Sequence, residues 1–134
     1  MGKVTAVSAI RKFGFRFHGD QLEMNFNKNG NSIGSILTMR TDSYNARIFE
    51  YADKIMASDD ICPAIPVSFH GVYVDLLNVS VISIRKGDFG ANQVVYIEIV
   101  YSHVRIKKSY MSQFNVDTEY HDDGSKKKVI YSKR

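Results

Sequence analysis

Hydrophobic and polar side chains alternate along most of the chain, and this period of two predicts a protein built mainly of β-strands. A tight hairpin turn is predicted at Asn29-Gly30. The clearest strand changes phase near Ser102, and a bulge there would keep its apolar residues on one face. The predicted strand-rich stretches are residues 4–8, 13–17, 22–40, 67–84 and 94–108.

One segment has a helical period instead. From Asp42 onward, apolar residues recur at three- and four-residue spacing, and Asp42 or Ser43 can cap the start, which predicts one helix of about 14 residues. The order of elements predicts a small closed β-barrel with one α-helix between strands 3 and 4. A C-terminal β-hairpin with its turn at Asp123-Gly124 follows. We therefore divide the chain into a barrel domain, 1–112, and a hairpin extension, 113–134.

Length and composition predict one folded globular unit. The chain has 134 residues, of which 44% are hydrophobic and 24% are charged. It has no apolar run of about 18 residues, so we expect no transmembrane helix. The first residues lack the features of a secretory signal, and the single cysteine, Cys62, fits a reducing compartment. A cytoplasmic protein is expected.

The net charge of +4 lies in the last quarter of the chain. Residues 101–134 contain eight Lys or Arg and four Asp or Glu, whereas residues 1–100 contain ten of each. This excess suggests an anionic partner. The run Lys126–Lys128 contributes less than its charge implies, because Asp117 and Glu119 are expected to lie across the hairpin from it.

The sequence offers no recognisable catalytic chemistry. It contains no phosphate-binding loop, nucleophile elbow or paired-cysteine zinc motif. Its four histidines, His18, His70, His103 and His121, are scattered without the spacing of metal ligands. We therefore expect no enzyme activity, no metal and no cofactor.

The N-terminal stretch "GKVTAVSAIRKFGF" resembles the opening of the cold-shock domain. A Gly-x-Val strand is followed by a basic residue and Phe-Gly-Phe, and the resemblance covers about the first 27 residues. The sequence departs from that family where Lys12 replaces a glycine and Arg16 replaces an aliphatic residue. Because burying an unpaired charge costs several kcal/mol, the phenylalanines should face the core and these cations the solvent.

Across most of its length the chain also resembles the single-stranded-DNA-binding proteins of bacteria, phages and plasmids. The similar segments are "NGNSIGSILTMR", "IFEYADKI", "CPAIPVSFHG" and "YIEIVYSHVRI". This resemblance implies an OB-like β-barrel that binds single-stranded nucleic acid without sequence specificity, DNA before RNA, and it is compatible with a homo-oligomer. The chain departs from the family in lacking tryptophan and in ending with a basic rather than an acidic tail.

The sequence predicts a nucleic-acid surface of cations and tyrosines on outward-facing strand positions. The cations would neutralise phosphates and the tyrosines would stack on bases. The alternative interpretation is that these are ordinary solvated strand residues. The predicted nucleic-acid-binding residues are Lys12, Arg16, Tyr73, Tyr96, Arg105 and Lys107.

A rival interpretation is a structural subunit that forms rings, as in the tail tubes of phages and type VI secretion systems. The segment "VYIEIVYSHVRIKKSY" and the terminal hairpin around "EYHDDGSKKK" are similar to the late strands of those proteins. The long loop by which members of that family stack rings is not evident. A third interpretation, a generic protein-interaction barrel, also stays open.

Overall fold

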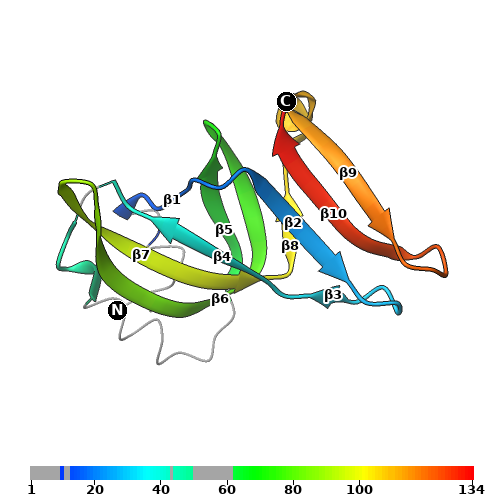
Figure 1. Ribbon diagram of the computed structural model, residues 1–134, viewed down its shortest axis with the longest axis horizontal. Coiled ribbons are helices and arrows are strands. Elements are labelled where there is room, and N and C mark those ends of the chain that lie inside the picture. The colour runs from blue at the N-terminus through cyan, green and yellow to red at the C-terminus, as the bar shows by residue number, and fades with distance from the viewer. Residues whose placement is uncertain (1–9, 11–12, 43, 50–61) are drawn as a thin grey trace.

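The computed structural model describes residues 10, 13–42, 44–49 and 62–134. Within these residues the fold is mainly β and consists of a barrel and a second sheet beside it (Figure 1). A short 3-10 helix, η1 (Lys108–Gln113), precedes the C-terminal hairpin. The strands are β1 (Arg16–Phe17), β2 (Gln21–Phe26), β3 (Ser32–Ile33), β4 (Ser35–Arg40), β5 (Cys62–Phe69), β6 (Val72–Phe89), β7 (Asn92–Tyr101), β8 (His103–Arg105), β9 (Phe114–Tyr120) and β10 (Lys126–Lys133).

The first sheet closes into a five-stranded barrel, which confirms the predicted small β-barrel. Its strands follow the order β5-β1-β4-β7-β6, and β6 pairs back with β5. The short strand β1 completes the ring because it pairs in parallel with β5 and antiparallel with β4. Strand β8 extends the sheet by pairing with the first part of β6.

Alternating side chains fill the barrel. In β7, Val95, Ile97 and Ile99 are buried, while the side chains between them face outward. The predicted phase shift lies where β7 ends and β8 begins, and Val104 beyond it is also buried. Both apolar sets therefore face the interior, as predicted. Strand β7 pairs with both β4 and β6, whereas β8 continues along β6 only in the described residues, so the pairing with β4 ends where the phase shifts.

The phenylalanine-rich segment points its rings inward, as predicted. Phe15 is buried, Phe13 and Phe17 pack against the core, and Arg16 is exposed. The strand itself is shorter than the alternation suggests. Gly14 has a φ of 64°, and its N–H donates to the carbonyl of Ile10, so the chain turns immediately before β1.

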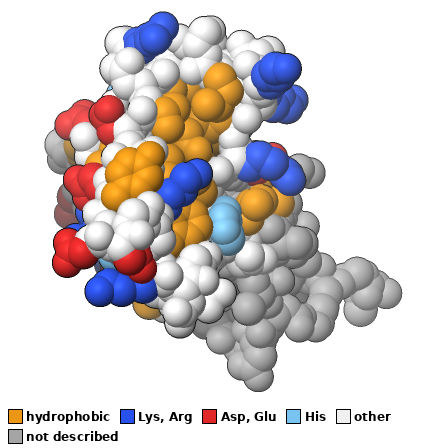
Figure 2. Space-filling model, turned by 90° about the vertical axis from the view of Figure 1, so that its right-hand side faces the viewer, with side chains coloured by type: hydrophobic (Ala, Val, Ile, Leu, Met, Phe, Trp, Pro, Cys, Tyr) orange, Lys and Arg blue, Asp and Glu red, His pale blue; other side chains and the backbone are white. Residues whose placement is uncertain are grey.

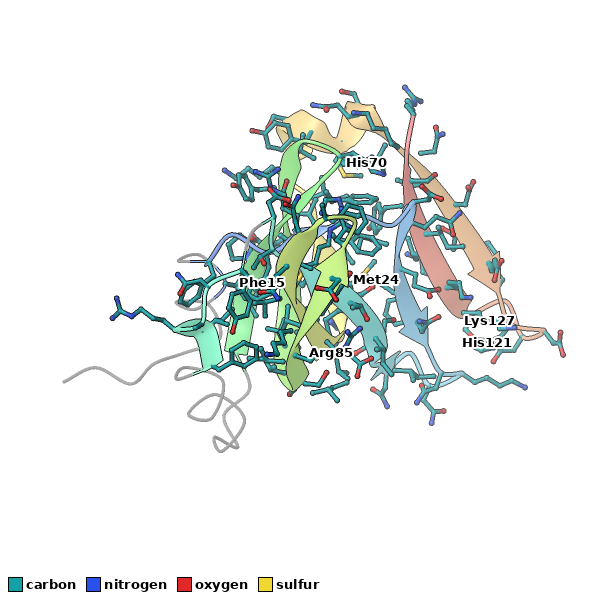
Figure 3. All side chains as sticks on the ribbon, turned by 60° about the vertical axis from the view of Figure 1, so that its left-hand side comes forward. Phe15, Met24, His70, Arg85, His121 and Lys127 are labelled. Carbon is teal, nitrogen blue, oxygen red and sulfur yellow. The ribbon has the colours of Figure 1, made fainter. Side chains whose placement is uncertain are left out.

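The second sheet has the order β3-β2-β10-β9 and contains the C-terminal hairpin. The hairpin turn lies at Asp123-Gly124, as predicted, and Gly124 has the positive φ of 86° that favours glycine. His121 and Lys127 lie at the far end of the hairpin, well away from Phe15 and Arg85 on the barrel (Figure 3). The hairpin is therefore part of a larger sheet that also includes β2 and β3.

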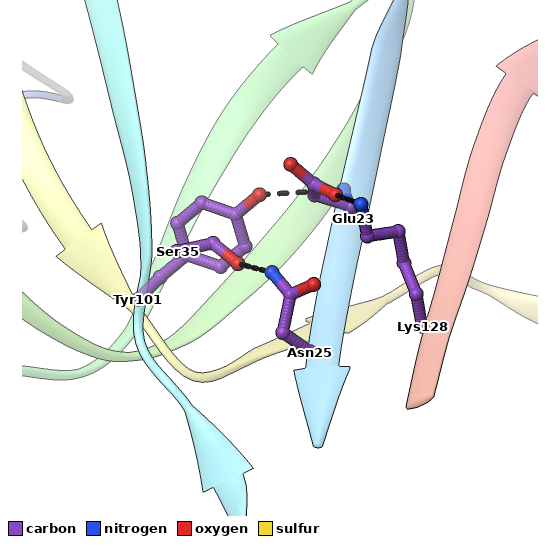
Figure 4. Close-up of polar contacts among 5 residues, drawn as sticks. All are labelled: Glu23, Asn25, Ser35, Tyr101 and Lys128. Carbon is purple, nitrogen blue, oxygen red and sulfur yellow. Dashed lines mark hydrogen bonds and ion pairs between the residues drawn. The ribbon is translucent and has the colours of Figure 1, made fainter. Parts of the chain in front are cut away.

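Polar contacts from β2 join the second sheet to the barrel (Figure 4). The backbone N–H of Glu23 donates to the hydroxyl of Tyr101 over 3.4 Å, and the Asn25 amide donates to Ser35 Oγ over 2.7 Å. On the other side of β2, Lys128 pairs with Glu23 at 3.3 Å. Burial raises the pKa of Tyr101, so this phenol stays neutral and accepts the Glu23 bond.

Two sequence predictions fall mainly on residues that the structure does not describe. The expected strand at 4–8 lies outside the described residues, and so does most of the expected helix after Asp42. Of the helix region, Ile48 and Phe49 are described and have helical backbone, and Ile48 is buried in the core. The position and length of the helix stay a prediction.

Gly34 provides a test of how the chain passes from one sheet to the other, because it separates β3 from β4. A Cβ at this position would lie 2.6 Å from Cγ1 of Val100. We expect Gly34→Ala to lower the free energy of unfolding by about 1–3 kcal/mol in urea denaturation. Adding Val100→Ala removes the methyl group that clashes, so the double variant should lose less than the sum of the single losses. Strictly additive losses would show that this contact is not the cause.

Candidate functional site

Strand pairing places three of the predicted residues, Arg16, Tyr73 and Tyr96, on one row around the barrel exterior. The row starts in β6, crosses β5, β1, β4 and β7, and returns to β6 further along that strand. Such a displacement is expected when tilted strands close a barrel. We call the residues of this row, in order, the arginine belt: Tyr73, Ser68, Arg16, Arg40, Tyr96 and Arg85.

Arg16 is exposed but already has an anionic partner. Its Nη1 lies 3.0 Å from a carboxylate oxygen of Asp42, and more than half of each side chain remains accessible, 57% and 54%. An exposed pair of this kind contributes little to stability. A guanidinium carries five N–H donors, so Arg16 can bind a second acceptor while it keeps this contact.

The two predicted stacking tyrosines have different surroundings. Tyr73 is 68% exposed next to the β5–β6 turn. Tyr96, in contrast, has the guanidinium of Arg85 4.4 Å from its ring centroid. Its ring also lies over Gly87, where an added Cβ would meet it at 2.6 Å. Tyr73 thus offers an open aromatic ring, whereas a base approaching Tyr96 would compete with Arg85.

Two members of the belt, Arg40 and Arg85, were not predicted. Arg40 is paired in register with both Arg16 and Tyr96, and its guanidinium lies 3.6 Å from the ring centroid of Phe89. Both arginines sit at outward positions of their strands. Alternation with the buried Leu37 and Met39 places Arg40 outward, whereas the outward position of Arg85 follows an irregularity between Val81 and Ser83 in β6. The strand register that brings them beside Arg16 and Tyr96 was not visible in the sequence, because it depends on which distant strands pair.

The remaining predicted residues lie off the belt or outside the described chain. Arg105 pairs with Asp75 at 3.0 Å in the row beside Tyr73. Lys107 is exposed in the segment after β8, and Lys12 is not among the described residues. In the hairpin, Lys128 lies across from Glu119, as expected, and pairs with Glu23, whereas Asp117 lies across from Ile130 and not from the lysine run. Carboxylates therefore neutralise part of the basic surface.

The second sheet offers a different kind of surface. Strand β9 forms one edge and β3 the other, and within the described part of the chain neither has a further strand partner. These edges are unequal, since β9 has seven residues and β3 has two. An unpaired edge exposes backbone N–H and C=O groups that can pair with another chain.

One face of this sheet is apolar out to the β9 edge. Leu22 in β2 is buried and lies in one row with Tyr131 in β10 and Val116 in β9. Burial decreases along the row, because Val116 is 44% exposed, and Tyr120 on the same face is 60% exposed. The side of the molecule that carries the hairpin presents a group of hydrophobic side chains, with Lys and Arg around it and Asp and Glu along one side (Figure 2).

The described residues contain no group of three or more His, Cys, Asp and Glu side chains arranged to hold a metal ion. None of the helices in the described part of the chain has the length and apolar character needed to cross a membrane. Comparison of the chain with protein-family models, with curated proteins and with solved structures gave no match.

The charges around the belt predict how His18 titrates. Partial burial lowers the pKa of His18 below its ordinary value of 6.5, the charge of Arg40 lowers it further, and Asp42 acts in the opposite direction. We expect Arg40→Gln to raise this pKa and Asp42→Asn to lower it, as followed by NMR of the ring protons. A pKa that is the same in both variants would contradict the described geometry.

The same shift has a consequence for stability. The unfolded state binds a proton at His18 more readily than the folded state does, so folding stability should fall as the pH falls below about 6.5. The loss is complete once the pH is below the folded-state pKa. Replacing His18 with Gln should remove this component from a series of urea denaturations across the pH range.

Proposed function

We propose that this protein is a structural subunit that assembles with copies of itself through the second sheet, in the manner of a ring-forming tube protein. The observation that carries this proposal is the four-stranded sheet, whose two edge strands have no further strand partner in the described part of the chain and whose apolar face is exposed toward β9. The edge of this sheet has more groups in need of a partner than the predicted nucleic-acid surface has. Its edge strand β9 has no further strand partner among the described residues, whereas two of the predicted cations already have carboxylate partners.

Several features make β9 suited to pairing. Its seven residues contain neither proline nor lysine, the residues that commonly protect an edge strand. The two acidic side chains, Asp117 and Glu119, share the polar face with Lys128 and do not interrupt the apolar one. A second chain could therefore continue the ladder and cover Val116 at the same time.

The opposite edge complements β9 in charge. Strand β3 consists of Ser32 and Ile33, Ile33 is exposed, and the preceding turn carries Lys28. Pairing of β9 in one copy with the β3 edge of the next would join two different surfaces. A head-to-tail contact of this type produces a closed ring or an open filament, depending on the rotation between copies.

The first experiment is light scattering coupled to size-exclusion chromatography over a series of protein concentrations, followed by negative-stain electron microscopy. We expect species larger than a monomer that grow with concentration and appear as rings. Val116→Lys places a charge on the apolar face at the edge and should weaken assembly by about tenfold or more.

The matched control for that variant is Ile36→Lys, because Ile36 is exposed on β4 of the barrel and lies outside the second sheet. It should leave assembly unchanged. A monomer at all concentrations, or equal effects of the two lysine variants, would overturn the proposed assembly.

A second candidate function is binding of single-stranded nucleic acid by the OB-like barrel predicted from the sequence. The observation that favours it is the arginine belt, in which Arg16, Arg40 and Arg85 lie in one row with Tyr73. An arginine stacked on an aromatic ring, as Arg85 is on Tyr96, keeps its N–H edges free to bind phosphate.

This candidate is tested with a labelled 30-nucleotide strand, as DNA and as RNA, with duplex DNA as the comparison. Fluorescence anisotropy at two salt concentrations should give tighter, salt-sensitive binding of the single strands. Arg85→Gln should weaken binding and reduce the salt slope by about 1. Lys127→Gln, at the distant hairpin tip, is the control and should have less effect. Absence of single-strand binding at low salt would rule out this candidate function and would not affect the assembly proposal.

A further inference from the structure

A hollow of about 340 Å³ lies beside the start of the arginine belt. It is formed where the chain before β1 passes next to β5 and β6. Its volume falls in the range of pockets that hold small organic ligands. The described residues that line it are Ile10, Gly14, Phe15, Arg16, Pro66, Ser68 and Tyr73.

The hollow combines an apolar interior with an aromatic rim. Ile10 and Phe15 belong to the buried core, so the packing of the barrel fixes the position of their side chains in the wall of the hollow. Pro66 and Ser68 come from outward positions of β5, and Tyr73 lies across from Ser68 on β6. Tyr73 lines the hollow and is largely exposed, so a flat ligand could stack on its ring.

Charge at the hollow favours an anionic ligand. Among the described residues that line it, Arg16 is the only charged one. Arg40 lies directly across from Arg16 on β4, one backbone strand spacing of about 4.8 Å away, and its guanidinium lies over the ring of Phe89. Asp42 pairs with Arg16 and opposes this positive potential in part. Two neighbouring arginines match the several oxygens of a phosphate better than a single carboxylate.

We propose that this hollow binds a nucleotide. The base enters the apolar part and stacks on Tyr73, and the phosphate lies on Arg16 toward Arg40. Ser68 offers a hydroxyl for the sugar between them. The ligand chemistry is thus a flat aromatic ring joined to a phosphate, and its source is either a free mononucleotide or the 5′ end of a strand. This proposal does not depend on the assembly proposed above.

The test measures binding of AMP to the full chain by isothermal titration calorimetry, with adenosine, inorganic phosphate and benzoate as comparison ligands. AMP should bind at least tenfold more tightly than any of the three. Equal binding of benzoate, or no heat of binding with millimolar AMP, would overturn the proposal. Oligonucleotides with and without a 5′-phosphate distinguish the two sources: a preference for the phosphorylated strand over AMP indicates a strand end.

Variants test which residue binds the base of AMP and which binds its phosphate. Tyr73→Ala should weaken AMP binding by about tenfold, since stacking on one aromatic side chain contributes on that scale. Arg16→Gln should abolish the preference for AMP over adenosine, and Asp42→Asn should tighten AMP binding. Tyr120→Ala is the matched control, an exposed tyrosine on β9 away from the hollow. If Tyr73→Ala and Tyr120→Ala behave alike, AMP does not bind in this hollow.

Discussion

Three stacked phenylalanine rings hold the two parts of the fold together. Phe69 of β5 stacks on Phe17 of β1 with the ring centroids 5.5 Å apart, and on Phe114 of β9 at 5.6 Å. The first contact supports β1, the two-residue strand that closes the barrel. The second attaches the edge strand of the other sheet to that same closure. The arginine belt and the open edge therefore both depend on one fully buried ring.

The distribution of charge on the molecule separates the candidate functions. The sequence has an excess of cations in its last quarter, yet several of the exposed cations meet carboxylates in the fold, such as Arg16 with Asp42 and Arg105 with Asp75. The two candidate anion sites described above are local: the stacked arginines of the belt and the hollow next to Tyr73. The second sheet differs, because its edges expose backbone N–H and C=O groups. Another β-strand, rather than an ion, can supply hydrogen-bond partners for these groups.

Properties that depend on alternation within one strand were predictable from the sequence. The inward rings of Phe15 and Phe17 and the hairpin turn at Gly124 are of this kind. Properties that depend on which strands pair were not. The hairpin joins β2 because Val129 lies across from Met24 and continues its apolar face. No pattern within either segment encodes that choice of partner.

The candidate site divides in the same way. Exposure of Arg16, Tyr73 and Arg105 follows from strand parity and agrees with the structure. The proximity of Arg16 to Arg40, and the contact of Tyr96 with Arg85, come from the register of a closed barrel. A single sequence contains the side chains of the belt but not their order around it.

The unequal lengths of β3 and β9 have a consequence for growth. Pairing between unlike edges gives every assembly a direction, so its two ends are chemically different: one presents the long strand and the other the short one. Growth of such a directional assembly can be stopped at one end alone. A short peptide that copies β9 would occupy the β3 end and stop addition there, while the β9 end continued to accept new subunits.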